Sequence, residues 1–266
     1  KKIETNGPDL LISFCSPEAS RIAFGLGIPH IAFSDSPHAK AVMKLSLPYV
    51  TKLLTPWIIP KKDFKEFGIN SRNIIQYRAI DAGVIIKNYR KTRKSKSNVK
   101  KTILIRPEES EAAYINKESK TIKIIEKIIE KFPDEKKIVL SRYKEQSNEV
   151  KRVFGKDVFI FSKPVNGKDL LDSVDCFVGS GGTMTAEAGL LGIPTISMNS
   201  VPNRIEDFLV KNKIIIRSES PNRISKEVFQ SLNNINIINK RKQNARKLVA
   251  SFEDPYQVLL KTIRTL

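Results

Sequence analysis

The tetrapeptide Leu-Gly-Ile-Pro occurs twice in the sequence, at residues 26–29 and 191–194. Each copy follows a short apolar run, a serine-containing turn and a helix-like segment with a Glu-Ala pair, and each precedes a β-branched run. A glycine and a proline after a helix are also ordinary signals for a helix end. The repeated strand–helix–strand context goes further and predicts two similar Rossmann-like units with parallel strands.

Strand-like and helix-like segments alternate along the rest of the chain. Short apolar runs such as residues 9–15 and 102–105 are typical of buried strands, and residues 117–132 have the periodicity of an amphipathic helix. A further strand is expected at residues 158–161, and helical structure from Ser225 to the C-terminus. These segments predict an α/β fold with helices on both faces of each parallel sheet.

A basic stretch separates the two predicted units. Residues 87–101 contain eight basic residues and no acidic one, and they lack hydrophobic periodicity. The predicted organisation is therefore a first unit over residues 1–86, a linker over 87–101 and a second unit over 102–266. The last helix of the chain could pack back on the first unit.

The net charge of +19, from 47 Lys and Arg against 28 Asp and Glu, raises the question of a nucleic-acid partner. Much of the excess is local, in residues 87–101 and in a second basic cluster within residues 240–247. No zinc finger, RNA-binding aromatic motif or KH-type clamp accompanies it. The charge therefore indicates basic patches that attract anions more than it indicates nucleic-acid recognition. A nucleic-acid or anionic-surface role stays open as an alternative.

Few residues suited to metal or disulfide chemistry are present. The two cysteines, Cys15 and Cys176, lie in apolar runs typical of buried, reduced thiols, and His30 and His38 are the only histidines. We therefore expect no metal site and no cofactor. No apolar run approaches the roughly 18 residues of a membrane span, and no signal-peptide core is present, so we expect a cytoplasmic protein.

The segment that most suggests chemistry is a glycine turn, Gly179-Ser180-Gly181-Gly182, between an apolar run and a helix-like segment. Consecutive glycines allow positive φ angles and close approach of the backbone to a ligand. The free N–H groups and the positive dipole end of the following helix favour a phosphate or diphosphate at this turn. Ser180 and Thr183 add hydroxyl groups. The alternative is a tight turn that binds nothing.

Glu187 follows Ser180 by seven residues, within the first turns of the same helix. Its carboxylate could accept hydrogen bonds from the two hydroxyls of a ribose, or it could simply stabilise the helix N-terminus by about 0.3–1 kcal/mol. The Ser-Gly-Gly, this Glu and the later Gly-Ile-Pro resemble the nucleotide-sugar signature of GT-B enzymes. Those enzymes include the glycosyltransferase that makes lipid II and the UDP-N-acetylglucosamine 2-epimerases.

More closely, the chain resembles a mostly archaeal family of uncharacterised proteins related to these enzymes. The segments that carry this resemblance span nearly the whole chain and are SPEASRIAFGLGIPHIAFSDSPHA, TPWIIP, ILIRPEESEAAY, VLSRYKEQ and GSGGTMTAEAGLLGIPTIS. The resemblance implies a GT-B arrangement of the two Rossmann-like units, in which the second unit holds a nucleotide-sugar, such as a UDP-sugar, as substrate.

The resemblance also implies roles for residues of the second unit. The turn at residues 180–183 would take the diphosphate and Glu187 the ribose. The loop around Lys163, Pro164 and Val165 would meet the base through its backbone. Arg106 and Arg142, each after a predicted strand, could neutralise a phosphate. For each arginine, an ordinary surface position is the alternative.

The first unit would then supply the acceptor site and the catalytic groups. The candidates are Glu18, Asp35 and His38, with Asp35 and His38 as a base and a positioning group. The alternatives are a helix cap for Asp35 and an exposed loop for His38. Hydrolysing epimerases place carboxylates at the corresponding strand ends, whereas the position after the first strand here is Ser16, which argues against assuming epimerase chemistry.

The first unit is expected to be truncated. GT-B proteins normally open with a glycine-rich strand–turn–helix and further βα units. From the usual size of a domain, this part would comprise about 70–90 residues. In the glycosyltransferase that makes lipid II, a catalytic His lies in this part. The sequence thus predicts a nucleotide-sugar enzyme that transfers or epimerises a sugar. Its basic patches would suit a lipid-linked or other anionic acceptor. A non-catalytic binding protein is the alternative, and the sugar and the oligomeric state stay open.

Overall fold

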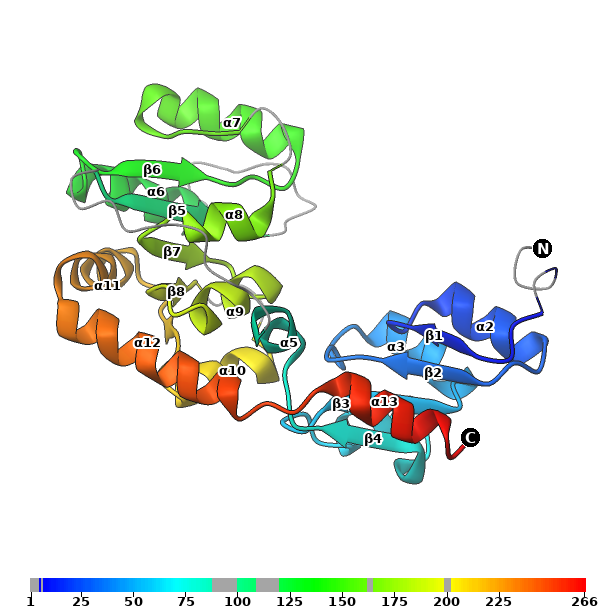
Figure 1. Ribbon diagram of the computed structural model, residues 1–266. Helices are drawn as coiled ribbons and strands as arrows, with labels where there is room; N and C mark the ends of the chain where they lie inside the picture. The colour runs from blue at the N-terminus through cyan, green and yellow to red at the C-terminus, as the bar shows by residue number, and fades with distance from the viewer. Residues whose placement is uncertain (1–4, 6, 88–99, 109–119, 162–164, 199–201) are drawn as a thin grey trace. The chain divides into compact units, whose positions relative to one another are not determined.

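The computed structural model divides the chain into two compact units (Figure 1). Unit 1 combines Lys1–Val84, Asn203–Ile205 and Phe252–Leu266, and unit 2 combines Ile85–Pro202 and Glu206–Ser251. Each unit is an α/β structure with one parallel sheet, as the sequence predicts. The residues that the structure describes are 5, 7–87, 100–108, 120–161, 165–198 and 202–266. Most of the predicted basic linker lies outside these residues.

The sheet of unit 1 has four parallel strands in the order β1-β2-β3-β4. They are β1 (Leu11–Ser13), β2 (His30–Phe33), β3 (Lys52–Pro56) and β4 (Ile74–Tyr77). The helices that accompany them are α2 (Pro17–Gly25), α3 (Lys40–Ser46), α4 (Lys62–Lys65) and α13 (Pro255–Ile263). Helix α5 (Asp81–Lys87) begins in unit 1 and ends in unit 2. Because the strands are parallel, their carboxyl ends lie at one edge of the sheet.

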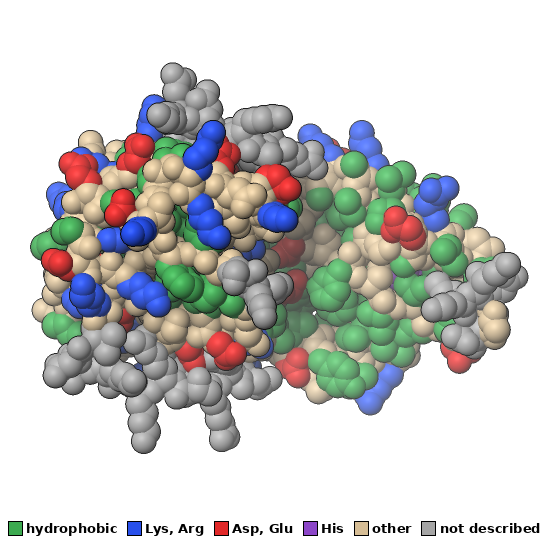
Figure 2. Space-filling view, turned by 90° about the horizontal axis from the view of Figure 1, so that it is seen from above, with side chains coloured by type: hydrophobic (Ala, Val, Ile, Leu, Met, Phe, Trp, Pro, Cys, Tyr) green, Lys and Arg blue, Asp and Glu red, His purple; other side chains and the backbone are tan. Residues whose placement is uncertain are grey.

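Helix α2 shows how the local sequence sets an element. The Ser16 side chain accepts a hydrogen bond from the Ala19 N–H, and Pro17 occupies the first helical position, as predicted. Two aromatic residues of this region are largely exposed, Phe14 at 73% and Phe24 at 63%. Figure 2 shows apolar side chains gathered on the visible face of unit 1.

The sheet of unit 2 has five parallel strands in the order β6-β5-β7-β8-β9. They are β5 (Thr102–Arg106), β6 (Lys136–Val139), β7 (Cys176–Gly179), β8 (Thr195–Ser197) and β9 (Ile216–Arg217). The helices are α6 (Lys120–Lys131), α7 (Lys144–Phe154), α8 (Gly167–Asp172), α9 (Thr183–Leu190), α10 (Arg204–Lys211), α11 (Pro221–Asn233) and α12 (Ile235–Ala250). Helix α10 begins where the chain passes from unit 1 to unit 2.

Helices cover both faces of the unit 2 sheet. Ile103 and Ile105 of β5 pack into a cluster with residues of α6 and α11, whereas Leu104 between them packs with residues of α8 and α9. This alternation follows from the two-residue period of a strand, and it explains why β5 is apolar on both faces. The core of unit 2 is therefore two layers on either side of one sheet.

The repeated tetrapeptide has one conformation in both units. Gly27 and Gly192 have φ values of +68° and +76°. In each copy the following isoleucine N–H donates to the carbonyl of an alanine five residues earlier, Ile28 to Ala23 and Ile193 to Ala188. Both copies thus end a helix with the same left-handed glycine and then start a strand.

The structure corrects one detail: the strand expected at residues 158–161 is a single bridge between Ile138 and Phe159. The helical structure expected from Ser225 consists of three helices, α11, α12 and α13, the first of which begins at Pro221. Both cysteines are free and buried, and burial raises the pKa of Cys15 to about 11 and that of Cys176 to about 12. Within the described residues, none of the helices is both long and apolar enough to cross a membrane.

Candidate functional site

The predicted glycine turn joins the carboxyl end of β7 to helix α9. Gly181 and Gly182 have φ values of +102° and +79°, which favour glycine. Gly182 is the N-cap of α9 and brings no side chain to cap it. The first intrahelical hydrogen bond runs from the Ala186 N–H to the Gly182 carbonyl, so the N–H groups of residues 183–185 precede it. This end of α9 has the form of an anion-binding helix N-terminus.

Two hydroxyl groups hold the turn in place. The buried Ser180 Oγ donates to the carbonyl of Pro107, just after β5, at 3.3 Å. Thr185 Oγ1 accepts a hydrogen bond from the Gly181 N–H at 3.2 Å. Ser180 and Thr185 therefore fix the backbone of the turn, and Thr183, the other predicted hydroxyl, lies exposed at the start of α9.

Gly179 is required for packing beneath the turn. A Cβ at this position would lie 2.4 Å from a ring carbon of Phe177 and 2.6 Å from Thr185 Oγ1. The sequence pattern did not single out Thr185, because its contacts to residues 179 and 181 depend on how the helix folds back over the strand end.

Glu187 lies on α9, half-buried, in the same helix that the turn begins. Burial raises the pKa of its carboxyl, and the charge of Lys168 on α8 lowers it in part. A partly desolvated carboxylate near the turn is available to accept hydrogen bonds, because acceptors in such surroundings bind donors more strongly than exposed ones do.

The two predicted arginines follow neighbouring strands of the same sheet. Arg106 ends β5 and pairs in register with Gly179 of β7, so its backbone lies directly beside the start of the glycine turn. Arg142 follows β6, and its N–H donates to Gln146 Oε1 at 2.9 Å. Gln146 in turn donates to the carbonyl of Glu108 at 3.2 Å, which ties the segments after β5 and β6 together.

Val165 lies just before α8, and its side chain packs against the apolar cluster on the α8–α9 face of the sheet. Lys163 and Pro164 of the same predicted loop lie outside the described residues. Unit 2 thus brings the glycine turn and the segment after β5 together at the carboxyl edge of one sheet. This edge is where ligands of open α/β sheets bind.

In unit 1, Asp35 follows the carboxyl end of β2 and is half-buried. Ser36 Oγ donates to Asp35 Oδ1 at 2.7 Å. Asp35 does not cap the next helix, since the N-cap of α3 is Ala39 and it makes no side-chain capping bond. His38 lies exposed in the same loop.

Glu18 is exposed in the first turn of α2. Its own backbone N–H, the Ser16 hydroxyl and the charge of Arg21 lower the pKa of its carboxyl, and the Ser16 Oγ lies 2.9 Å from Glu18 Oε2. In the described part of the chain, no hydrogen bond or ion pair joins Glu18 to Asp35 or His38. The structure therefore gives Glu18 a helix-capping environment.

Two residues that the sequence patterns missed lie near Asp35. Tyr77 ends β4, and its Oη donates to Asp81 Oδ1 at 2.5 Å. Burial and the charge of Asp35 raise the pKa of Asp81, while the Tyr77 hydrogen bond lowers it in part. Burial, Asp81 and Asp35 also raise the pKa of Tyr77. A half-buried acid, a buried tyrosine and a second carboxylate are groups that can carry out acid–base chemistry. The four-residue spacing of Tyr77 and Asp81 was the available signal.

Comparison with other sequences identifies a family and one archaeal relative. A family model described as "Protein of unknown function (DUF354)" matches residues 1–265. An uncharacterised protein of Methanocaldococcus jannaschii is 32% identical over 201 residues, which cover 71% of this chain and 57% of that relative. The match therefore spans little more than half the length of this relative.

Comparison with solved structures shows the fold. The UDP-GlcNAc 2-epimerase of Neisseria meningitidis, bound to UDP-GlcNAc, matches 100% of this chain and 78% of its own with a TM-score of 0.72 and 14% identity. HepE of Anabaena, in complex with UDP and glucose, matches 100% and 80% with a TM-score of 0.71 and 12% identity. The epimerase of Methanocaldococcus jannaschii matches 93% and 77% with a TM-score of 0.61 and 17% identity. These likenesses confirm the predicted fold class of GT-B glycosyltransferases and epimerases.

Proposed function

The chain belongs to the DUF354 family, and from this premise we propose that it is a GT-B-like enzyme whose unit 2 binds a UDP-sugar. The observation that carries the proposal is the glycine turn between β7 and α9. Its positive-φ glycines and the uncapped start of α9 suit a diphosphate. Structures of the same fold have been solved with UDP or UDP-sugars bound.

In this proposal, different residues around the turn bind different parts of the nucleotide. The N–H groups at the start of α9 take the diphosphate, and Glu187 accepts hydrogen bonds from the ribose. Arg106, whose backbone lies in register with Gly179, and Arg142 supply positive charge to the departing diphosphate. In this proposal, these cationic groups and the helix dipole stabilise the negative charge of the diphosphate, and no metal ion is required.

Unit 1 supplies the acid–base groups in the same proposal. Asp35 acts as the base that removes a proton from the acceptor or from the sugar, and Asp81, whose pKa is raised, acts as a proton donor. Transfer and epimerisation differ in their products. Incubation with UDP-GlcNAc followed by NMR separates them: a 2-epimer, free or still linked to UDP, indicates epimerisation, whereas UDP released with an unepimerised sugar indicates transfer to an acceptor or to water. Binding without either product, in the presence of candidate acceptors, would indicate a non-catalytic protein.

Calorimetric titration with UDP and UDP-GlcNAc tests the nucleotide site. Gly182→Asp places a carboxylate at the open start of α9, where a Cβ would meet no atom within 4 Å. We expect this substitution to weaken UDP binding at least tenfold, because it sets a negative charge against the diphosphate.

Gly155→Asp is the matched control. Gly155 also has a positive φ, +53°, and open space around its Cβ, but it lies at the end of α7. This variant should bind UDP within twofold of the wild type. The proposal fails if neither nucleotide binds the wild-type chain, or if both substitutions weaken binding equally.

A further inference from the structure

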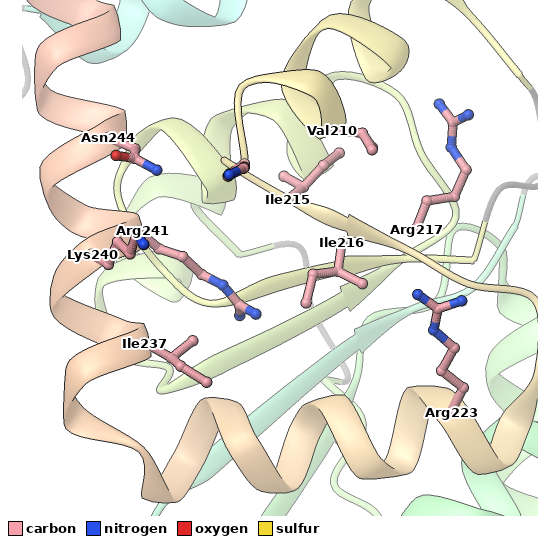
Figure 3. A pocket seen from close by; sticks show the side chains of 10 residues that line it. Val210, Ile215, Ile216, Arg217, Arg223, Ile237, Lys240, Arg241 and Asn244 are labelled. Atoms are coloured by element: carbon pink, nitrogen blue, oxygen red, sulfur yellow. The ribbon is translucent and has the colours of Figure 1, made fainter.

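A separate pocket lies in unit 2 beside the edge strand β9. It has a volume of about 390 Å³ and is lined by residues of α10, β9, α11 and α12 (Figure 3). Ligand pockets commonly measure about 300–1,000 Å³, so this pocket can hold a small molecule. None of the residues assigned above to nucleotide binding lines it.

The lining of this pocket, which we call the β9 pocket, is strongly basic. It includes five cationic side chains and no carboxylate; the cations are Lys213, Arg217, Arg223, Lys240 and Arg241. Figure 3 shows Arg241 extending from α12 and Arg223 from α11, on different walls of the pocket. Cations that converge from separate elements favour an anionic ligand.

Two of these arginines are held in place by the protein. Arg217 Nε and Nη2 lie 2.8 Å from Glu206 and 2.7 Å from Asp207, which largely neutralise it. Arg241 is only 11% exposed, donates to Ser231 Oγ at 3.0 Å and has its ion pair with Glu227 at the longer distance of 3.8 Å. Burial lowers the pKa of Arg241, yet a guanidinium stays charged at neutral pH, so a nearby anion would stabilise it.

The other three cations complete the positive charge. Lys213, Arg223 and Lys240 are exposed, and no described carboxylate forms an ion pair with them. Against the five lining cations stand the three acids Glu206, Asp207 and Glu227, which pair with Arg217 and Arg241. The β9 pocket therefore keeps an excess of positive charge.

Apart from Asn244, the remaining walls of the β9 pocket are apolar. Ile215, Ile216 and Ile237 line it together with Val210. A bare inorganic anion would leave this surface in contact with water, whereas a ligand with an apolar part would cover it and gain about 25 cal/mol for each Å² removed from water. The lining therefore suits a molecule with an anionic end and a short apolar chain.

The β9 pocket is distinct from the glycine turn. The charge of Arg241 acts on the thiol of Cys176, the first residue of β7, whereas the glycine turn follows Gly179, the last residue of that strand. At about 3.3 Å per residue, Cys176 and Ser180 are roughly 13 Å apart. We infer that the β9 pocket is a second binding site of unit 2, for a phosphate monoester that carries a short apolar chain.

Calorimetry on the full chain tests this inference with three probes: hexyl phosphate, inorganic phosphate and hexanol. Hexyl phosphate should bind at least tenfold more tightly than either of the other two, because only it satisfies both the cations and the apolar walls. The double substitution Arg223→Gln with Lys240→Gln should weaken hexyl phosphate binding at least tenfold. Both side chains are exposed, so the fold should tolerate the change.

The matched control is Lys226→Gln with Arg246→Gln. Both residues are exposed on the same two helices, α11 and α12, and neither lines the β9 pocket. Their substitution removes the same charge as the test variant does. The control should bind hexyl phosphate within twofold of the wild type. Equal weakening in both double variants, or no saturable binding of hexyl phosphate by the wild type, would overturn the inference.

Two further measurements distinguish binding in the β9 pocket from binding at the glycine turn. Gly182→Asp, which should weaken UDP binding, is expected to leave hexyl phosphate binding unchanged. If it abolishes that binding instead, the phosphate sits at the glycine turn and the β9 pocket is not a second site. If inorganic phosphate binds as tightly as hexyl phosphate, the ligand class is wrong.

Discussion

His30 is the buried one of the two histidines, and burial lowers the pKa of its imidazole. Its Nε2 lies 2.8 Å from the Ser13 hydroxyl oxygen. Because the folded state disfavours the charged ring, the unfolded state takes up a proton at a higher pH than the folded state does. The stability that depends on neutral His30 is therefore complete above the ordinary pKa of 6.5 and is lost as the pH falls toward the lowered value.

We expect the melting temperature to fall between about pH 7 and pH 5.5, and His30→Gln to flatten this dependence. His38→Gln, at the exposed histidine, is the matched control and should keep the wild-type slope. Thermal unfolding followed by circular dichroism at a series of pH values measures both. Equal slopes for the wild type and His30→Gln would mean that other groups carry the acid sensitivity.

Helix α9 packs so closely on the segment before β9 that its Gly189 has no room for a methyl group. A Cβ there would lie 2.6 Å from Cγ2 of Ile215 and 3.1 Å from Cγ2 of Ile214. Gly189→Ala should lower the free energy of unfolding by about 1–3 kcal/mol, since overpacking a core costs that much. Urea unfolding followed by circular dichroism measures the change.

Gly25→Ala is the control for this prediction, because a Cβ at the end of α2 would meet no atom within 4 Å. It should leave the free energy of unfolding unchanged or raise it slightly. A Gly189→Ala variant as stable as the wild type would show that the two isoleucines move aside at no cost.

The elements that the sequence predicted well are those set by neighbouring residues. Ser16 and Pro17 start α2 through local hydrogen bonding and a fixed φ, and the glycine turn follows from consecutive glycines. Strand β9 escaped prediction because two residues carry no periodicity, and they form a strand only by pairing with β8. The expected strand at 158–161 failed for the converse reason, since it finds only one bridge.

In the candidate site, too, some features are set by neighbouring residues and others depend on the fold. The geometry of the glycine turn could be predicted from consecutive residues, because positive φ angles at glycines and the start of a helix are set locally. The contact of Thr185 with the Gly181 N–H could not be predicted, because folding of the turn brings these two residues together. Likewise, the effect of Asp35 on the Tyr77–Asp81 pair depends on the arrangement of the strands in the sheet. The β9 pocket collects side chains from four elements, and no linear pattern marks such a set.

At the scale of the whole molecule, the chain returns to unit 1 after it has built unit 2. Residues 252–266 belong to unit 1, and Phe252 is 2% exposed there. Its ring fills the space beside Gly83, where a Cβ would lie 2.3 Å from it, and lies 6.1 Å from the ring of Trp57 between centroids. The Glu253 N–H donates to the Arg78 carbonyl at 3.1 Å. The two ends of the sequence thus share one core.

Phe252→Ala should therefore destabilise unit 1 although it lies at the far end of the sequence. Removing a buried phenylalanine costs about 3–5 kcal/mol, and Trp57, the only tryptophan, reports the unfolding of unit 1 by its fluorescence. The urea midpoint of that signal should fall in Phe252→Ala. It should stay in place in Phe229→Ala, the control, which removes a ring that is 47% exposed on α11. An unchanged midpoint in Phe252→Ala would mean that the Phe252 ring does not contribute to the stability of unit 1.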